Sequence, residues 1–120
     1  SVYIKLAEEE ERGDCYKRAI EAYEGVLQVY IGDQYPADYA KAQLNLGMAY
    51  RSLAVIKDPA ENCAKAITAF ENALKFYTMK HLPNEYALIQ DNLGNIYFIL
   101  AARENVIVKK RFNALKKRLK

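Results

Sequence analysis

A twelve-residue phrase occurs twice in this chain and limits the folds available to it. Residues 39–50 read YAKAQLNLGMAY and residues 86–97 read YALIQDNLGNIY, so seven of the twelve positions are identical at an offset of 47 residues. Pro36 and Pro83 precede the two copies at the same offset. Similarity at one fixed period of this size indicates stacked repeats, in which neighbouring units share a continuous core.

The similarity extends beyond this phrase. At the same offset, Ala19, Ile20, Ala22, Glu24, Leu27 and Tyr30 recur as Ala66, Ile67, Ala69, Glu71, Leu74 and Tyr77, and Tyr3, Leu6 and Ala7 recur as Tyr50, Leu53 and Ala54. The period therefore covers about residues 3–101, and it fails after Ala101.

Each period predicts two helices. Proline suits the first turn of a helix and keeps the preceding residue out of the helical region, so Pro36 and Pro83 mark helix starts. Asp58-Pro59 reads as an N-cap followed by a first-turn proline, and Asp14 reads as another cap. No segment alternates apolar and polar residues over a useful length. The sequence therefore predicts an all-α chain with helices at 2–11, 14–31, 36–56, 59–80, 83–103 and 106–119.

Gly47 and Gly94 lie in the middle of predicted helices, where glycine costs about 1 kcal/mol relative to alanine. This cost is tolerable where a neighbouring helix approaches closely, so we expect such a contact at both glycines. The residues that we expect to be buried around them are Leu46, Tyr50, Phe70, Leu74, Leu93 and Tyr97.

These positions resemble the tetratricopeptide repeat (TPR), a helix-turn-helix unit with the pattern W-x2-L-G-x2-Y…A-x3-F…P. The matching residues are Leu46, Gly47, Tyr50, Ala66, Phe70 and Pro83 in one unit, Leu93, Gly94 and Tyr97 in the next, and Ala19, Tyr23 and Pro36 in the unit before. Gln43 and Gln90 replace the tryptophan. The TPR period is about 34 residues, so roughly 13 additional residues would lengthen each helix by nearly two turns.

The resemblance implies a single array of antiparallel helix pairs stacked as an α-solenoid, a long 47-residue-period variant with about two and a half repeats. A partial first repeat would occupy residues 1–35 and a second repeat residues 36–82. The third would occupy residues 83–120 and would end in a shortened, basic helix.

The residue patterns of catalysis are missing from the sequence. His81 is the only histidine, and Cys15 and Cys63 are isolated from each other and from any histidine. There is no Gly-rich phosphate loop, metal-spaced cluster or nucleophile arrangement. We therefore expect no enzyme, no cofactor and no metal site. Two isolated thiols suggest a reducing, cytoplasmic compartment, and no apolar run reaches the 18 or so residues of a membrane span.

The resemblance also implies a ligand face, because the first helix of each TPR pair lines a concave surface that holds extended peptides. The implied candidates are Lys41, Asn45, Met48, Arg51 and Ser52, with Leu88, Asn92, Asn95 and Ile99 in the next repeat. A side-chain amide both donates and accepts hydrogen bonds, so Asn45 and Asn92 could hold a peptide backbone of any sequence. Alternatively, each asparagine bonds a neighbouring helix and ties the stack together.

The side chains around these asparagines predict a preference. Lys41 and Arg51 place positive charge near one half of the surface, and Leu88, Phe98 and Ile99 make the other half apolar. The preferred ligand would then carry an acidic group towards the earlier repeat and an apolar side chain towards the later one.

The C-terminus departs from the repeat. Residues 104–119 resemble 61–77 only with a deletion of about six residues. Val108, Phe112, Leu115 and Leu119 form an apolar stripe at spacings of four, three and four. Residues 103–120 carry eight basic side chains and one acidic, whereas the whole chain has a net charge of +3. This segment could cap the last repeat. It could also meet an acidic protein, an anionic membrane surface or nucleic acid. Nucleic acid is the weakest alternative, because no known binding module surrounds the short basic helix.

Two functions remain open. The first is a protein–protein interaction scaffold that binds a peptide or partner helix of unknown identity on the concave face. The second is a structural assembly module that self-associates or stacks with further repeats of a longer parent. The chain starts near the counterpart of Ala49, so helix 14–31 should expose apolar surface. Such patches recruit other copies, which predicts a homodimer or domain exchange.

Overall fold

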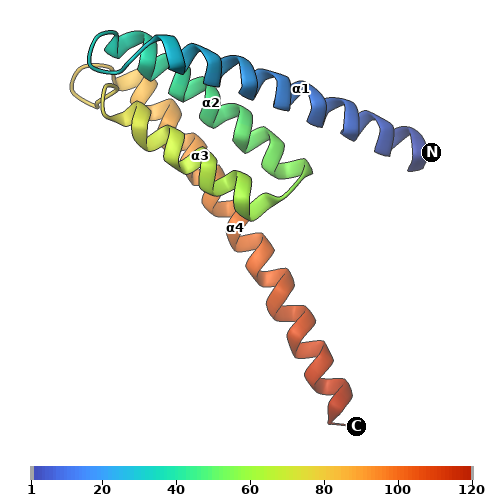
Figure 1. Ribbon diagram of the computed structural model, residues 1–120. Helices are drawn as coiled ribbons and strands as arrows, with labels where there is room; N and C mark the ends of the chain where they lie inside the picture. The colour runs from blue at the N-terminus through green and yellow to red at the C-terminus, as the bar shows by residue number, and fades with distance from the viewer. Residues whose placement is uncertain (1, 120) are drawn as a thin grey trace.

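The computed structural model describes residues 2–119, and this range contains four helices (Figure 1). Helix α1 spans Val2–Val29, α2 spans Pro36–Ile56, α3 spans Pro59–Leu74 and α4 spans Pro83–Arg118. No strand occurs between residues 2 and 119. The predicted all-α class is therefore confirmed.

Three of the helices begin at a proline, as predicted. The turn between α2 and α3 is closed by Asn62, whose side-chain Nδ2 donates to the Lys57 carbonyl oxygen at 2.7 Å. Asp58 occupies the N-cap position with a left-handed backbone (φ 44°), but its side chain makes no capping hydrogen bond. The predicted cap position is correct, and the asparagine in the first turn stabilises it instead.

Two predicted helix breaks do not occur, since α1 and α4 each run through them as continuous helices. The turn of the second repeat contains Asp58-Pro59. The same repeat position holds Glu11-Arg12 in α1 and Asn105-Val106 in α4. Without proline, every backbone N–H at these positions can continue the helical hydrogen bonding. Gly13 is accommodated within α1, and the prediction of Asp14 as a helix cap is wrong because it lies in the middle of that helix.

Helix α3 is shorter than predicted and ends at Leu74 rather than near Lys80. The backbone N–H groups of Phe76 and Tyr77 both donate to the Ala73 carbonyl oxygen, at 3.1 and 3.0 Å. This tightened end carries Tyr77 into the core, where it is buried. The residues after Leu74 were predicted to continue the helix to about Lys80. They instead bury this ring and lead the chain to Pro83.

The core lies between α2, α3 and α4, and a second cluster joins α1 to α2 and α3. The largest fully buried side chains are Phe70, Ile89, Ile96 and Cys63. Phe70 lies against Gly47, where an added Cβ would be 2.7 Å from its ring. The close helix approach predicted at Gly47 is therefore confirmed.

The approach predicted at Gly94 is wrong. This glycine is helical, but nothing outside its own helix lies within 4 Å of where a Cβ would stand. Tyr97, expected to be buried, is 57% exposed. Both errors have one cause: α4 continues straight past Asn105, so no second helix of the pair folds back over this side.

The remaining burial predictions hold in part. Leu46, Phe70 and Leu93 are buried, as predicted. Tyr50 and Leu74 are half-buried and pack against the edge of the core.

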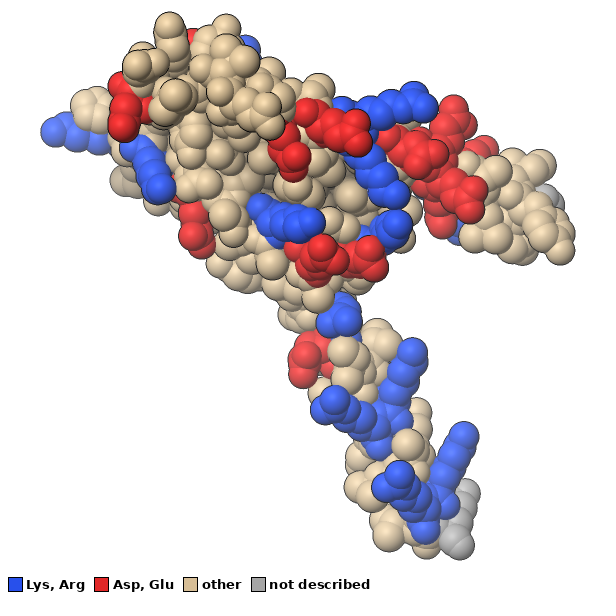
Figure 2. Space-filling model, viewed as in Figure 1, with Lys and Arg blue, Asp and Glu red and all other residues tan. Residues whose placement is uncertain are grey.

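Both terminal helices extend beyond the bundle (Figure 1). The Cα radius of gyration is 17.9 Å, whereas a compact domain of this length would have about 14 Å. Acidic side chains gather on the projecting part of α1, and basic side chains follow the projecting half of α4 (Figure 2). The two projecting helix ends therefore carry opposite charge, and their apolar residues are largely exposed.

Candidate binding groove

A hollow of about 360 Å³ lies beside α2, between α1 and α4. We call it the α1–α2–α4 groove. Its lining residues are Glu9, Arg12 and Tyr16 of α1, Arg51, Ser52, Val55 and Ile56 of α2, and Ile99 of α4. Concave sites of several hundred Å³ with mixed apolar and polar linings are the usual setting for ligands.

The helical periodicity explains how the groove is built. Residues three or four apart share one face of a helix, so Arg51, Ser52 and Val55 project to the same side of α2. Glu9, Arg12 and Tyr16 share a face of α1 only because that helix continues through Gly13. Because a helix break was predicted at residues 12–13, these three residues of α1 were missed. Their spacing of three and four could have indicated that they share one face of a continuous helix.

The groove combines two guanidinium groups, one carboxylate (Glu9) and apolar surface. Within the described residues 2–119, neither Arg12 nor Arg51 has an ion-pair partner. Val55 is 72% exposed beside them, and Ile99 lies on the α4 side. A guanidinium group presents a planar fork of donors that matches a carboxylate. The arrangement is therefore suited to an acidic group placed next to an apolar side chain.

Of the nine residues proposed from the sequence, the structure brings Arg51, Ser52 and Ile99 together in the groove. Met48 and Ile99 are half-buried against the core. Lys41, Leu88 and Asn95 are exposed but do not line this hollow.

The two equivalent asparagines lie in different environments. Asn92 is only 5% exposed, and its Nδ2 donates to the Leu88 carbonyl oxygen of the same helix at 2.8 Å. This buried amide, bonded within its own helix, does not fit the peptide-holding alternative for Asn92. Asn45 is half-buried, and its amide has no hydrogen-bond partner within residues 2–119. A backbone-holding role therefore fits Asn45 better than Asn92, and it stays a prediction for both.

Tyr50 joins α1 to α2 outside the groove. Its hydroxyl donates to Oε1 of Glu24 at 2.8 Å, and the Lys65 ammonium group lies 5.7 Å from the ring centroid. Burial, together with the hydrogen bond to Glu24, raises the pKa of Tyr50 to about 12. The phenol therefore stays neutral and keeps donating at physiological pH.

A second hollow, of about 470 Å³, opens near the other end of α2. It lies between the α1–α2 loop and the end of α3, and Leu27, Tyr39 and Phe76 are among its lining residues. None of the residues proposed from the sequence lines it.

No protein-family model, curated protein or solved structure matches this chain. Between residues 2 and 119, no group of three or more His, Cys, Asp and Glu side chains is placed to hold a metal ion. No helix in that range is both long and apolar enough to cross a bilayer. The groove geometry is accordingly the basis for assigning a function.

Proposed function

We propose that this chain is a protein–protein interaction scaffold that binds a peptide or a partner helix in the α1–α2–α4 groove. The observation that carries this proposal is the pair of unpartnered guanidinium groups of Arg12 and Arg51 beside exposed Val55. Such a surface offers directional charge recognition and apolar burial in one place. Binding, rather than catalysis, is the role that these residue types serve.

The ligand that fits best carries a carboxylate and an apolar side chain. The carboxylate would meet Arg51 on α2, and the apolar side chain would lie towards Ile99 on α4. Asn45 lies one to two turns away on α2, with its amide free to hold the ligand backbone. This orientation keeps part of the preference predicted from the sequence. Arg51 and Ile99 line the groove, whereas Lys41, Leu88 and Phe98 do not.

We further propose that the array is a TPR-like α-solenoid and one domain over residues 1–120. The 47-residue repeat, the antiparallel α2–α3 pair and the contact of Phe70 with Gly47 support this. A cytoplasmic location is supported by the two free thiols, Cys15 and Cys63.

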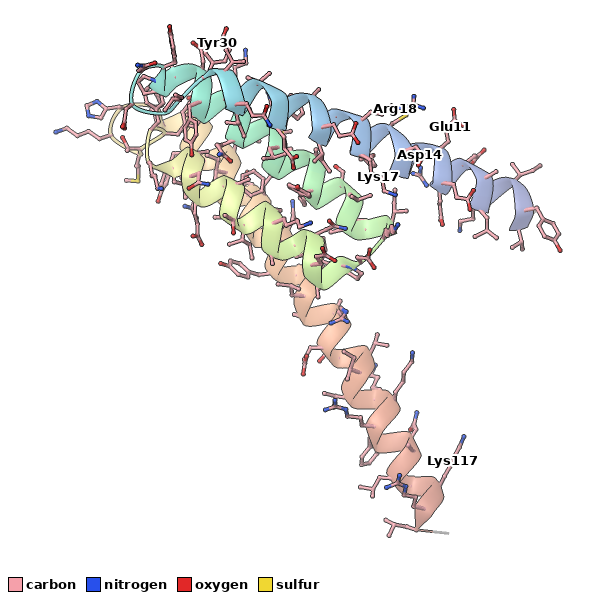
Figure 3. All side chains as sticks on the ribbon, in the orientation of Figure 1. Glu11, Asp14, Lys17, Arg18, Tyr30 and Lys117 are labelled. Carbon is pink, nitrogen blue, oxygen red and sulfur yellow. The ribbon has the colours of Figure 1, made fainter. Side chains whose placement is uncertain are left out.

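The binding role is tested with peptides selected from a displayed random library. A selected peptide is titrated by fluorescence anisotropy against wild type, Arg51→Met and the control Arg18→Met. Arg18 is exposed and lies on the side of α1 away from α2 (Figure 3), so both variants lose one positive charge. A hydrogen bond to a charged group contributes about 1.5–3 kcal/mol, so Arg51→Met should weaken binding at least tenfold. Equal effects of the two variants on affinity would contradict peptide binding in this groove.

A second role, as an assembly module, is favoured by a different observation. The projecting half of α4 exposes Val108, Phe112 and Leu115, each by more than half of its surface. Within the described residues, no other helix covers that half. Contiguous apolar surface on a helix is typical of an interaction face.

A further inference from the structure

Helix α4 carries an exposed stripe on the side opposite the core. It begins at Gly94 and ends at Leu119, and we call it the outer stripe. Its members include Gly94, Phe98, Ala101, Val108, Phe112 and Leu115. Phe98 is 75% exposed and Phe112 56%.

The spacing within the outer stripe is regular. With Asn105 included, its residues alternate between steps of four and three. Alternating steps of this kind define the seam of a left-handed coiled coil, in which two helices pack knobs into holes. The core residues Ile89, Ile96 and Leu93 lie on a different face of α4, and the bundle leaves the side chains of the seam exposed.

The repeat indicates what kind of residue belongs on this seam. In the second repeat, Phe70 of the following helix packs on Gly47. Gly94 is the counterpart of Gly47, and the run Phe112-Asn113-Ala114-Leu115-Lys116 resembles Phe70 to Lys75 with Glu71 deleted. Phe112 cannot reach Gly94 of its own chain, because 18 residues of straight helix separate them by about 27 Å. A second copy of the chain can supply it.

We propose that two copies of this chain pair their α4 helices antiparallel, with the two-fold axis passing beside Arg103. This register places Phe112 of each copy against Gly94 of the other. It also places Phe98 against Val108, and Asn105 against Ala101. The Phe112 ring thus meets the glycine, and the asparagines of the two copies lie in adjacent layers on either side of the two-fold axis. The proposal deepens the assembly role and does not depend on the groove.

Charge favours the antiparallel direction. The last turn of α4 contains Lys116, Lys117 and Arg118, and Figure 3 shows Lys117 at the far end of the projecting half. In the proposed pair this basic end lies along the first part of the other α4, where Asp91 lies next to the seam. A parallel pair would instead hold the two basic ends together, where like charges repel.

The exposed apolar surface of α4 is close to the amount that a specific dimer buries. Tyr97 flanks the outer stripe beside Phe98 and Ala101. The exposed parts of Tyr97, Phe98 and Phe112 amount to roughly 750 Å² over two copies, taking about 200 Å² for each ring. Val108 and Leu115 are also more than half exposed. Together these approach the range of about 1,200–2,000 Å² for specific interfaces. Each projecting half of α4 would lie along the bundle of the other copy. The pairing would therefore cover the outer stripe both on the projecting half and on the half that packs in the bundle.

The first test compares two valines in the projecting half. Val108 lies on the outer stripe and is 54% exposed, whereas Val106 lies off it and is 51% exposed. Sedimentation velocity without peptide is recorded for wild type, Val108→Asp and Val106→Asp across roughly a hundredfold range of concentration. We expect a reversible wild-type dimer, which Val108→Asp weakens at least tenfold while Val106→Asp leaves it nearly unchanged. A wild type that stays monomeric refutes both the assembly role and this interface. A dimer that both variants weaken equally, or neither weakens, refutes only the interface.

The second test fixes the register. Asp91→Cys and Leu115→Cys are combined in a Cys15→Ser background. These sites face each other in the antiparallel pair but lie about 36 Å apart in one chain, far beyond the roughly 7 Å limit for a disulfide. Mild oxidation should yield a covalent dimer from the double variant and little from either single variant. Cross-linking of single variants would indicate a parallel pair, and a disulfide within monomers would indicate a folded-back segment; either result overturns the proposal.

Discussion

Gly47 and Gly94 occupy the same position in two successive repeats, yet substitution by alanine should affect them in opposite directions. At Gly47 the new methyl group would lie 2.7–2.9 Å from three atoms of the Phe70 ring. Phe70 is completely buried, so its ring can move only by displacing the closely packed side chains around it. At Gly94 the methyl group would meet no atom of another helix within 4 Å.

The magnitudes follow from two opposing terms. Alanine is favoured over glycine in a helix by about 1 kcal/mol at either position. Overpacking a filled core costs about 1–3 kcal/mol, and the immobile ring places Gly47 in the upper part of that range. Gly47→Ala should therefore lower the free energy of unfolding by about 1–2 kcal/mol, and Gly94→Ala should raise it by about 1 kcal/mol.

Urea unfolding followed by circular dichroism measures both variants, at a concentration low enough for the chain to be monomeric. If Gly47→Ala stabilises the protein as much as Gly94→Ala does, the α2–α3 contact is not as described. At high concentration the Gly94→Ala gain should shrink, because the methyl group then competes with Phe112 of the second copy for the same space.

Three further predictions concern single side chains. Tyr50→Phe removes the hydrogen bond to Glu24. Because folding raises the pKa of Tyr50 from 10 to about 12, the wild-type advantage in unfolding free energy should be complete below pH 10 and lost as pH rises towards 12. Urea unfolding at a series of pH values checks this, and an advantage that persists at pH 12 would contradict it. Asn62→Ala leaves the Lys57 carbonyl without its partner and should cost about 1–3 kcal/mol in thermal or urea unfolding; no loss would mean that the turn does not need this bond. Asn45→Ala should weaken binding of a selected peptide about fivefold with little change in stability, whereas Asn92→Ala should lower stability by about 1 kcal/mol; titration and unfolding of both variants separate the roles, and equal effects would contradict them.

The sequence predicts helix positions well where proline acts directly. Pro36 and Pro83 fix the starts of α2 and α4, and the bounds of α2 agree with the prediction because a second proline follows at Pro59. The repeat alone was misleading where proline is absent. It implied turns near Gly13 and Asn105, but a repeat copies a turn only if the residues that break the helix are copied too.

The same limit applies to packing and to the groove. Gly94 and Tyr97 match the buried Gly47 and the half-buried Tyr50 of the second repeat, but burial depends on a partner helix that their own sequence does not contain. The predicted groove residues Arg51 and Ser52 lie on one helix, whose face is predictable from periodicity. Arg12 was missed because its place opposite α2 depends on α1 being continuous, which is a property of the folded chain.

Hydrogen exchange of residues 104–118 at low and high protein concentration tests most directly whether a second copy covers the outer face of α4. In a monomer this segment is a helix end without tertiary contacts, which should open and exchange readily. We expect little protection at low concentration and a marked rise in protection at high concentration, without any added peptide. Strong protection already present in dilute monomers, or exchange that remains rapid at every concentration, would contradict the account.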